Sequence, residues 1–201
     1  GVLRVENESE LKKNYWETIA NTYSRQLLVE KVIFGSVVTV EGIYTDKFYN
    51  ITFSTKRMHP KFIENAMHLQ FPGSLHRSVV EKLYAFNHAL VKEINIDFGL
   101  THSEFIVDNE DVYFIEIANR GGGVHISNLI IPAISGIDTS GILIDAACGK
   151  TTSLDKFFPF QIDKVSFLHF FDFGVGSVIG VQNMNRAEVS SGILFVKLFF
   201  K

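Results

Sequence analysis

Two short apolar runs on either side of a polar turn constrain this chain more than any other feature. The first run covers residues 100–107 and the second covers residues 112–118, and both are rich in β-branched and aromatic side chains. The segment between them, 108–111, reads Asp-Asn-Glu-Asp, which favours a turn. The pattern therefore predicts a β-hairpin.

One glutamate lies on each predicted strand of this hairpin. Side chains on one face of a strand recur every second residue, so a loop that places Ile106 opposite Phe114 also places Glu104 opposite Glu116. A loop one residue different would separate the two carboxylates. Like charges directly opposite each other destabilise a sheet unless a cation lies between them or they share a proton, and oxygen ligands favour magnesium or manganese. The alternative is that one glutamate faces solvent and the other joins a surface ion pair.

The second strand runs into an arginine and three consecutive glycines. Glycine lets the backbone approach a ligand closely, and the planar guanidinium of Arg120 suits a carboxylate or a phosphate. Gly121, Gly122 and Gly123 therefore predict an anion-binding loop beside the glutamates. His125 follows this loop and is a candidate for contacting substrate or for capping a helix.

The order of these residues resembles the ATP-grasp ligases. In carboxylate-activating members a Glu is followed twelve residues later by Glu-x-Asn-x-Arg and then by a glycine-containing loop, and here Glu116 follows Glu104 by twelve residues. The resemblance implies that Glu104 and Glu116 hold the magnesium ions that bridge the phosphates of ATP. It implies that Arg120 grips the carboxylate, carbonate or acyl phosphate that reacts. The glycines and His125 would form the substrate loop.

The resemblance extends over about residues 1–150. Residues 27–35 look like the hinge strand of the family, in which Glu30 and the backbone of Lys31, Val32 and Ile33 would bind the adenine. Lys56 lies where members of the family place basic residues near the ATP phosphates. The alternative for Lys56 is a solvated Lys-Arg pair at a strand end.

The chain departs from the family pattern at three positions. Ala118 replaces the metal-binding Asn, and Asn119 is expected to point to the opposite face, which leaves a second metal in doubt. Val37 replaces a Glu that grips the ribose, and Glu41 is out of register for that role. Val124 replaces the general-base Glu of the biotin carboxylases, which argues against that branch.

The first residues resemble the stretch that follows the phosphate-covering glycine loop of the family. The resemblance therefore implies an ATP-grasp domain truncated at its N-terminus, and the isolated chain is expected to turn over poorly. We expect an α+β fold with a mostly antiparallel sheet, packed helices and a small C-terminal β-rich lobe. The expected domains are residues 1–150, the C-terminal part of the ATP-grasp domain, and 151–201, a β-rich lobe that need not be complete.

Periodicity and capping residues place the remaining elements. A helix is predicted from Asn7, whose side chain would cap it together with Glu10. The other expected helices cover residues 75–94, 126–135 and 138–148, and a connecting loop covers 150–160. Besides the hairpin, the expected strands cover residues 27–33, 37–44, 48–55, 164–171, 176–181 and 192–200.

Composition excludes several classes of protein. A net charge of −3 gives no general attraction to nucleic acid, and no apolar run reaches the ~18 residues of a membrane span. The single cysteine, Cys148, excludes an internal disulfide and is predicted to be a packed thiol. Seven histidines without a close metal-type spacing give no strong zinc signal. A cytoplasmic enzyme is expected.

By resemblance, the function is an ATP- and magnesium- (or manganese-) dependent carbon-nitrogen ligase. It would activate a small carboxylate as an acyl phosphate and transfer it to an amine, and a homodimer is the assembly considered. One alternative is a carbamoyl-phosphate-synthase-type enzyme that activates carbonate. Others are a nucleotide-binding module without turnover, and a generic α+β domain with a fortuitous hairpin.

Overall fold

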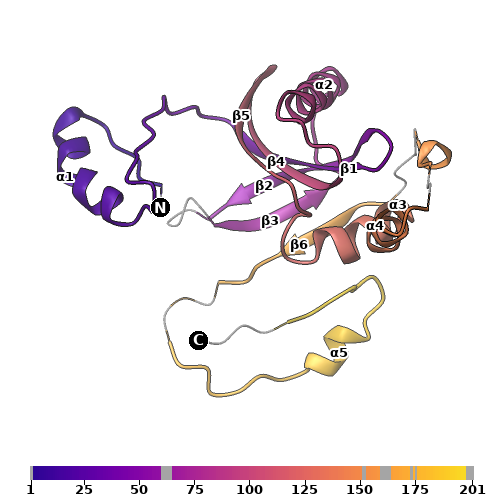
Figure 1. Cartoon of the computed structure of the whole chain (residues 1–201). Helices are drawn as coiled ribbons and strands as arrows, with labels where there is room; N and C mark the ends of the chain where they lie inside the picture. Colours follow the sequence, from indigo (N-terminus) through magenta and orange to yellow (C-terminus); the bar gives the residue numbers. More distant parts are fainter. Residues whose placement is uncertain are drawn as a thin grey trace.

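The computed structural model describes residues 2–59, 65–150, 153–158, 164–172, 174 and 176–197 (Figure 1). The strands are β1 (Ser36–Tyr44), β2 (Phe48–Met58), β3 (Ala66–Phe71), β4 (Gly99–Asp108), β5 (Asp111–Ala118) and β6 (Ser166–His169). The helices are α1 (Glu8–Ala20), α2 (Arg77–Glu93), η1 (Ile126–Ile130), α3 (Ile131–Ser135), α4 (Thr139–Ala147), η2 (Asp155–Phe157) and α5 (Met184–Glu188).

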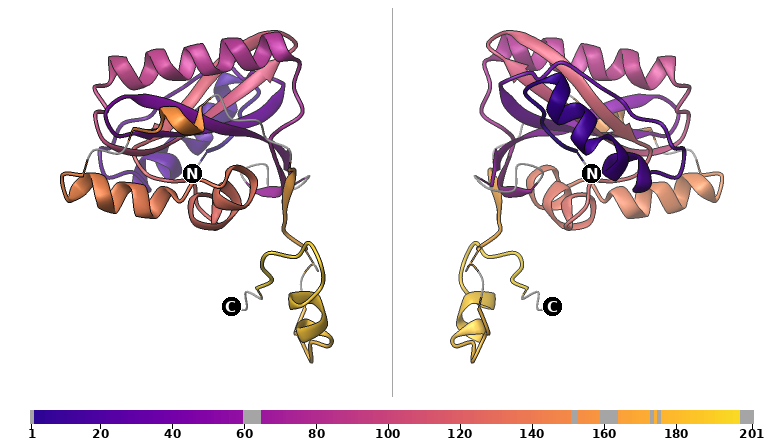
Figure 2. Two further views of the ribbon diagram at one scale, coloured as in Figure 1. Left: turned by 90° about the vertical axis from the view of Figure 1, so that its right-hand side faces the viewer. Right: turned by 90° about the vertical axis from the view of Figure 1, so that its left-hand side faces the viewer.

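All six strands form one sheet in the order β5-β4-β1-β2-β3-β6, and every neighbouring pair is antiparallel. Helix α2 covers one face of this sheet, and η1, α3 and α4 lie on the other side (Figures 1 and 2). Helix α1 and the segment that carries α5 project away from the sheet. The arrangement confirms the predicted α+β class with a mostly antiparallel sheet and packed helices.

A separate apolar core lies on each face of the sheet. Because strand side chains alternate, Val38, Val40 and Phe105 point toward α2, where they pack against Val79 and Leu83. The opposite core holds side chains of β1, β2 and β3 together with those of η1, α3 and α4. Burial on both faces fixes the strand registers, since a slip of one residue would exchange the two sets of side chains.

The hairpin of β4 and β5 contains a β-bulge that decides which side chains face each other. Near the turn the register differs from the expected one, because Ile106 pairs with Tyr113 and not with Phe114. A bulge between Glu104 and Phe105 then shifts the pairing by one residue. Glu104 is therefore opposite Glu116, as predicted, although the loop alone would have separated them.

Three predicted strands differ from the structure. Residues 27–33 are extended, mostly exposed and pair with no described strand, since the apolar pattern of a segment does not reveal whether a partner lies beside it. Residues 176–181 form no strand, and neither do the described residues of the predicted strand 192–200, which end at 197. Of the predicted strand 164–171, β6 forms and joins the edge of the main sheet at β3.

Most predicted helices are confirmed. Asn7 caps α1 by accepting a hydrogen bond from the backbone N–H of Glu10 at 3.0 Å, and Asp138 caps α4 in the same way through Gly141. The sequence pattern missed the short helices η2 and α5. Cys148 was predicted to be packed but is exposed, because it follows the last turn of α4 at the surface.

No single helix among the described residues is long and apolar enough to cross a membrane. One bent pair, Ile126–Ser135 with Thr139–Ala147, passes that test jointly by length and composition, and its two parts meet at 111°.

Candidate functional site

Strands β1 and β4 place a group of charged side chains on the face of the sheet opposite α2. Phe105 points into the α2 core, so its neighbour Glu104 and, two residues earlier, His102 point the other way. Across the ladder Glu41 pairs with His102. Glu41 is 1% exposed, which requires polar partners, because a buried charge without them is costly.

Four side chains form a continuous ionic chain on this face. The Nδ1 of His102 donates to Oε1 of Glu41 at 2.6 Å, and its Nε2 donates to Oε1 of Glu104 at 3.3 Å. The Nζ of Lys56, from β2, donates to the same Oε1 of Glu104 at 2.5 Å. Within the described part of the chain, Oε2 of Glu104 receives no hydrogen bond. One oxygen of this carboxylate is thus held and the other is open.

These contacts shift the protonation of two groups. Burial alone would lower the pKa of His102, but hydrogen bonds to Glu104 and Glu41 outweigh it and raise that pKa from 6.5 to about 9. The hydrogen bond from His102 lowers the pKa of Glu104 from 4.5 to about 2, against burial and with help from Lys56. His102 is therefore a cation and Glu104 an anion at neutral pH.

Folding stability should depend on pH through the same two groups. The pKa of His102 is raised on folding, so its contribution is complete below pH 6.5 and is lost as the pH rises to about 9. The pKa of Glu104 is lowered, so its contribution is complete above pH 4.5 and is lost as the pH falls toward 2. Urea unfolding in EDTA should show both declines. His102→Gln should lack the alkaline decline, and an unchanged alkaline slope in that variant would contradict this assignment.

The predicted anion-binding loop, Gly121–Gly123, is called the glycine loop below, and it packs directly on this ionic chain. The backbone N–H of Gly122 donates to Oε2 of Glu41 at 3.2 Å. A Cβ at Gly122 would lie 2.9 Å from both oxygens of Glu41 and from Nδ1 of His102, so only glycine fits without displacing them. The predicted anion-binding loop thus already holds an internal anion, the carboxylate of Glu41.

The other residues of the predicted substrate loop are more open. Arg120 is exposed, and its Nη1 donates to the carbonyl oxygen of Gly121 at 3.0 Å. A Cβ at Gly123 would meet nothing within 4 Å. His125 has a φ of +64° at the start of η1 and makes no side-chain cap there; its ring lies 4.6 Å from that of Phe195.

Glu116 and its neighbours define the second side of the predicted metal site. The Glu116 side chain is exposed and makes no hydrogen bond or ion pair with any described residue. Ala118 pairs with His102, so a longer side chain at this position would reach the ionic chain. Asn119 lies instead beside Gly99, with its Oδ1 3.0 Å from where a Cβ of that glycine would be. Gly99 is five residues from Glu104, or about 16 Å along a strand.

The predicted adenine-binding residues lie apart from this group. Glu30, Lys31 and Val32 are exposed, and Ile33 is half-buried, on the unpaired segment that leads from α1 to β1. Among the described residues, no hydrogen bond or ion pair links these four to the hairpin. Val37, the residue that replaces the expected ribose-binding Glu, is paired with Lys56 on β2 and Ile106 on β4.

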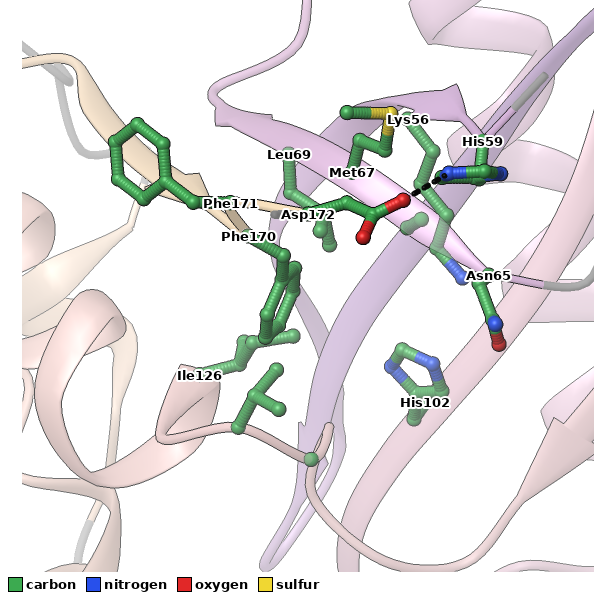
Figure 3. A pocket seen from close by; sticks show the side chains of 13 residues that line it. Lys56, His59, Asn65, Met67, Leu69, His102, Ile126, Phe170, Phe171 and Asp172 are labelled. Carbon is green, nitrogen blue, oxygen red and sulfur yellow. Dashed lines mark hydrogen bonds and ion pairs between the residues drawn. The ribbon is translucent and has the colours of Figure 1, made fainter. Parts of the chain in front are cut away.

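A cavity of about 600 Å³ adjoins the ionic chain (Figure 3). Lys56 and His102 lie at one end, and Phe170 and Ile126 lie at the other, with Gly123 also in the lining. His59 and Asp172 also line the cavity, and a hydrogen bond of 2.9 Å joins Nε2 of His59 to Oδ2 of Asp172. The volume is within the range of about 300–1,000 Å³ for small-molecule sites.

The carboxylates fit a magnesium ion that is completed by a ligand. Among the described residues there is no group of three or more His, Cys, Asp or Glu side chains that could hold a metal alone. Magnesium in nucleotide sites usually uses only one or two carboxylates, plus phosphate oxygens and water. Glu104 and Glu116, which are paired across the bulge, would be those two carboxylates.

Glu41 is the site residue that sequence reasoning missed. It was considered only as a ribose ligand, whereas the structure places it under the glycine loop and against His102. The available signal was a glutamate inside the apolar β1, on the same face as residues that turn out to be buried. The partner strand could not be known from that signal.

Comparison with known proteins identifies the domain. Residues 1–128 match the family described as ATP-grasp domain. No curated protein matches the chain. The solved structures described next share 17–23% of its sequence, so their likeness concerns the fold.

Three of these structures illustrate the likeness. An L-amino acid ligase from Bacillus licheniformis has a TM-score of 0.70 and 18% identity, and the match covers 83% of this chain and 41% of that one. A biotin carboxylase from Campylobacter jejuni has a TM-score of 0.69 and 23% identity, with 81% and 37% covered. A phosphoribosylglycinamide synthetase from Anaerococcus prevotii has a TM-score of 0.57 and 17% identity, with 72% and 37% covered. The chain thus spans about two fifths of the length of these proteins.

Proposed function

The chain belongs to the ATP-grasp domain family, and from this membership and the geometry of its hairpin we propose that it is part of an ATP- and magnesium-dependent carboxylate-amine ligase. The observation that carries the proposal is the pairing of Glu104 with Glu116 beside Lys56 and the glycine loop. The bulge that restores this pairing re-aims a side chain, as bulges next to active sites often do.

The candidate residues would divide the work of binding and activation as follows. Glu104 and Glu116 would hold Mg²⁺ or Mn²⁺, which would neutralise charge on the phosphates of bound ATP. Arg120 is exposed next to the glycine loop and would grip the carboxylate or the acyl phosphate. The ammonium of Lys56 has three donors, so Lys56 would contact the phosphates while keeping its hydrogen bond to Glu104. The family resemblance alone assigns adenine binding to Glu30 and the backbone of residues 31–33, because this segment lies apart from the hairpin.

The reaction would proceed in two displacement steps. A carboxylate oxygen of the acid attacks the γ-phosphorus of ATP, the bond from that phosphorus to the β-γ bridging oxygen breaks, and ADP leaves. An amine then attacks the carbonyl carbon of the acyl phosphate, inorganic phosphate leaves, and the amine loses a proton. Such transfers depend on positioning and electrostatics, which suits a site without a protein nucleophile. The cavity beside Lys56 and His102 would hold the acid.

Carbonate activation is a variant of the same first step, and the loop after Arg120 does not distinguish it. A biotin carboxylase is a weaker proposal despite the structural likeness, because Val124 supplies no general base where that branch carries a Glu.

A nucleotide-binding module without turnover is the second candidate. The observation that favours it is the position of Asn119, whose amide lies beside Gly99 and not beside the glutamates. Ala118 stands where the family has its metal-binding Asn, and Asn119 does not replace it. Val37 stands where the family has its ribose-binding Glu, so that contact is also missing.

Trapping of the acyl phosphate separates the two candidates. The full-length protein is incubated with ATP, Mg²⁺, hydroxylamine and each of the twenty amino acids or bicarbonate in turn, and hydroxamate or ADP formation is measured. The ligase proposal predicts acid-dependent ADP release that Glu104→Gln reduces at least 100-fold. Asp111→Asn, an exposed carboxylate at the start of β5, is the control and should keep activity. Tight nucleotide binding without ADP release for any acid would favour the module.

A further inference from the structure

The ionic chain beneath the glycine loop carries an inference that rests on the proposed function and goes beyond it. We propose that Glu41 and His102 are positioning residues, which aim the Oε2 of Glu104 at the metal nucleotide and tie that aim to the glycine loop. Neither residue would touch the metal or the substrate phosphates.

The hydrogen bonds define how the positioning works. His102 uses both ring nitrogens, Nδ1 to Glu41 at 2.6 Å and Nε2 to Oε1 of Glu104 at 3.3 Å. The ring therefore cannot rotate without breaking a bond to one carboxylate. Because Lys56 also binds Oε1 of Glu104, that oxygen is held from two sides and Oε2 is the one left for a ligand.

Glu41 connects this arrangement to the loop. Its Oε1 receives His102 and its Oε2 receives the N–H of Gly122, so both oxygens are used. The side chain is 1% exposed and cannot exchange these partners for water. A shift of the glycine loop would therefore move Glu41, then His102, and then Glu104.

Outer groups that orient a ligand affect metal affinity strongly. Mutation of such groups typically costs about 10–100-fold in metal affinity. Glu41→Gln keeps the shape of the side chain but turns one of its two acceptors into a donor, so either His102 or Gly122 loses its partner. The effect on metal binding should then arise without any change in a residue that touches the metal.

A double-variant cycle on manganese binding tests the proposal. The Kd of Mn²⁺ in the presence of ADP is measured by electron paramagnetic resonance in the full-length protein and in Glu41→Gln, Glu104→Gln and the double variant. We expect Glu41→Gln to weaken binding about 10–100-fold, and to weaken it no further when Glu104 is already Gln. An equal Kd in Glu41→Gln and the parent would overturn the proposal. A loss of affinity in the double variant equal to the product of the two single fold-losses would overturn it too.

Two controls separate positioning from loss of structure and from failure of the proposed function. Val79→Ala removes buried contacts on the α2 face, so it should lower stability without changing the Kd. Glu41→Asp keeps the charge but is too short to hold both partners, and it serves if Glu41→Gln does not fold; an unchanged Kd in it would also overturn the proposal. A parent that binds no Mn²⁺ with ADP would refute the proposed function itself, and this inference with it.

Discussion

Replacing Gly122 with alanine is expected to lower the free energy of unfolding by about 2–5 kcal/mol, since it overpacks a buried site and disrupts a charged hydrogen bond. The added Cβ would lie 2.9 Å from both oxygens of Glu41 and from Nδ1 of His102. These atoms cannot move away easily, because Glu41 and His102 are buried and bonded to each other at 2.6 Å. Urea unfolding monitored by circular dichroism measures the loss.

The adjacent glycine provides the matched control for this prediction. A Cβ at Gly123 would meet nothing within 4 Å, so Gly123→Ala should change the stability by no more than about 0.5 kcal/mol. If the two variants were equally stable, Gly122 would not be in contact with Glu41, and the loop would have to adopt another conformation.

Replacing Phe105 with alanine is expected to lower the free energy of unfolding by about 3–5 kcal/mol, which is the usual range for a fully buried phenylalanine. Phe105 is 0% exposed on β4, and its ring lies 5.7 Å from that of Phe86 on α2. The variant would open a cavity between the sheet and this helix. The alternation along β4 means that the same residue holds the strand in the register that aims Glu104 at the opposite face.

Phe114→Ala on the neighbouring strand is the comparison for Phe105→Ala. The Phe114 ring lies 5.9 Å from that of Phe105 but is 39% exposed, so its removal should cost clearly less. A loss in Phe114→Ala as large as that in Phe105→Ala would contradict the assignment of β4 faces.

Local patterns predicted the parts of the fold that depend on neighbouring residues. The capping side chains of Asn7 and Asp138 were correctly identified because a cap acts within three residues. The hairpin was found because two β-rich runs flank a short polar turn. The spacing of twelve between Glu104 and Glu116 was also informative, and it led to the family that residues 1–128 match.

Features that depend on distant partners could not be predicted in this way. The alternation of apolar and polar residues along β5 does not reveal the bulge that pairs Glu104 with Glu116. The predicted pairing of these two glutamates was therefore correct, although the predicted register near the turn was wrong. Residues 27–33 have a strand-like composition, but composition does not supply a partner strand. Contact between Gly122 and Glu41 joins residues 81 positions apart.

The domain boundary near residue 150, a cytoplasmic location and a homodimer stay predictions.

The central claim is that Glu104 and Glu116 together hold a metal nucleotide, and calorimetric titration with ADP and Mg²⁺ tests it most directly. The titration compares the protein with Glu104→Gln, Glu116→Gln and the control Asp111→Asn, each with and without Mg²⁺. We predict magnesium-dependent ADP binding that both glutamate variants weaken at least tenfold and that Asp111→Asn leaves unchanged. Binding of ADP that is independent of Mg²⁺, or equally tight in the Glu104 and Glu116 variants, would contradict the account.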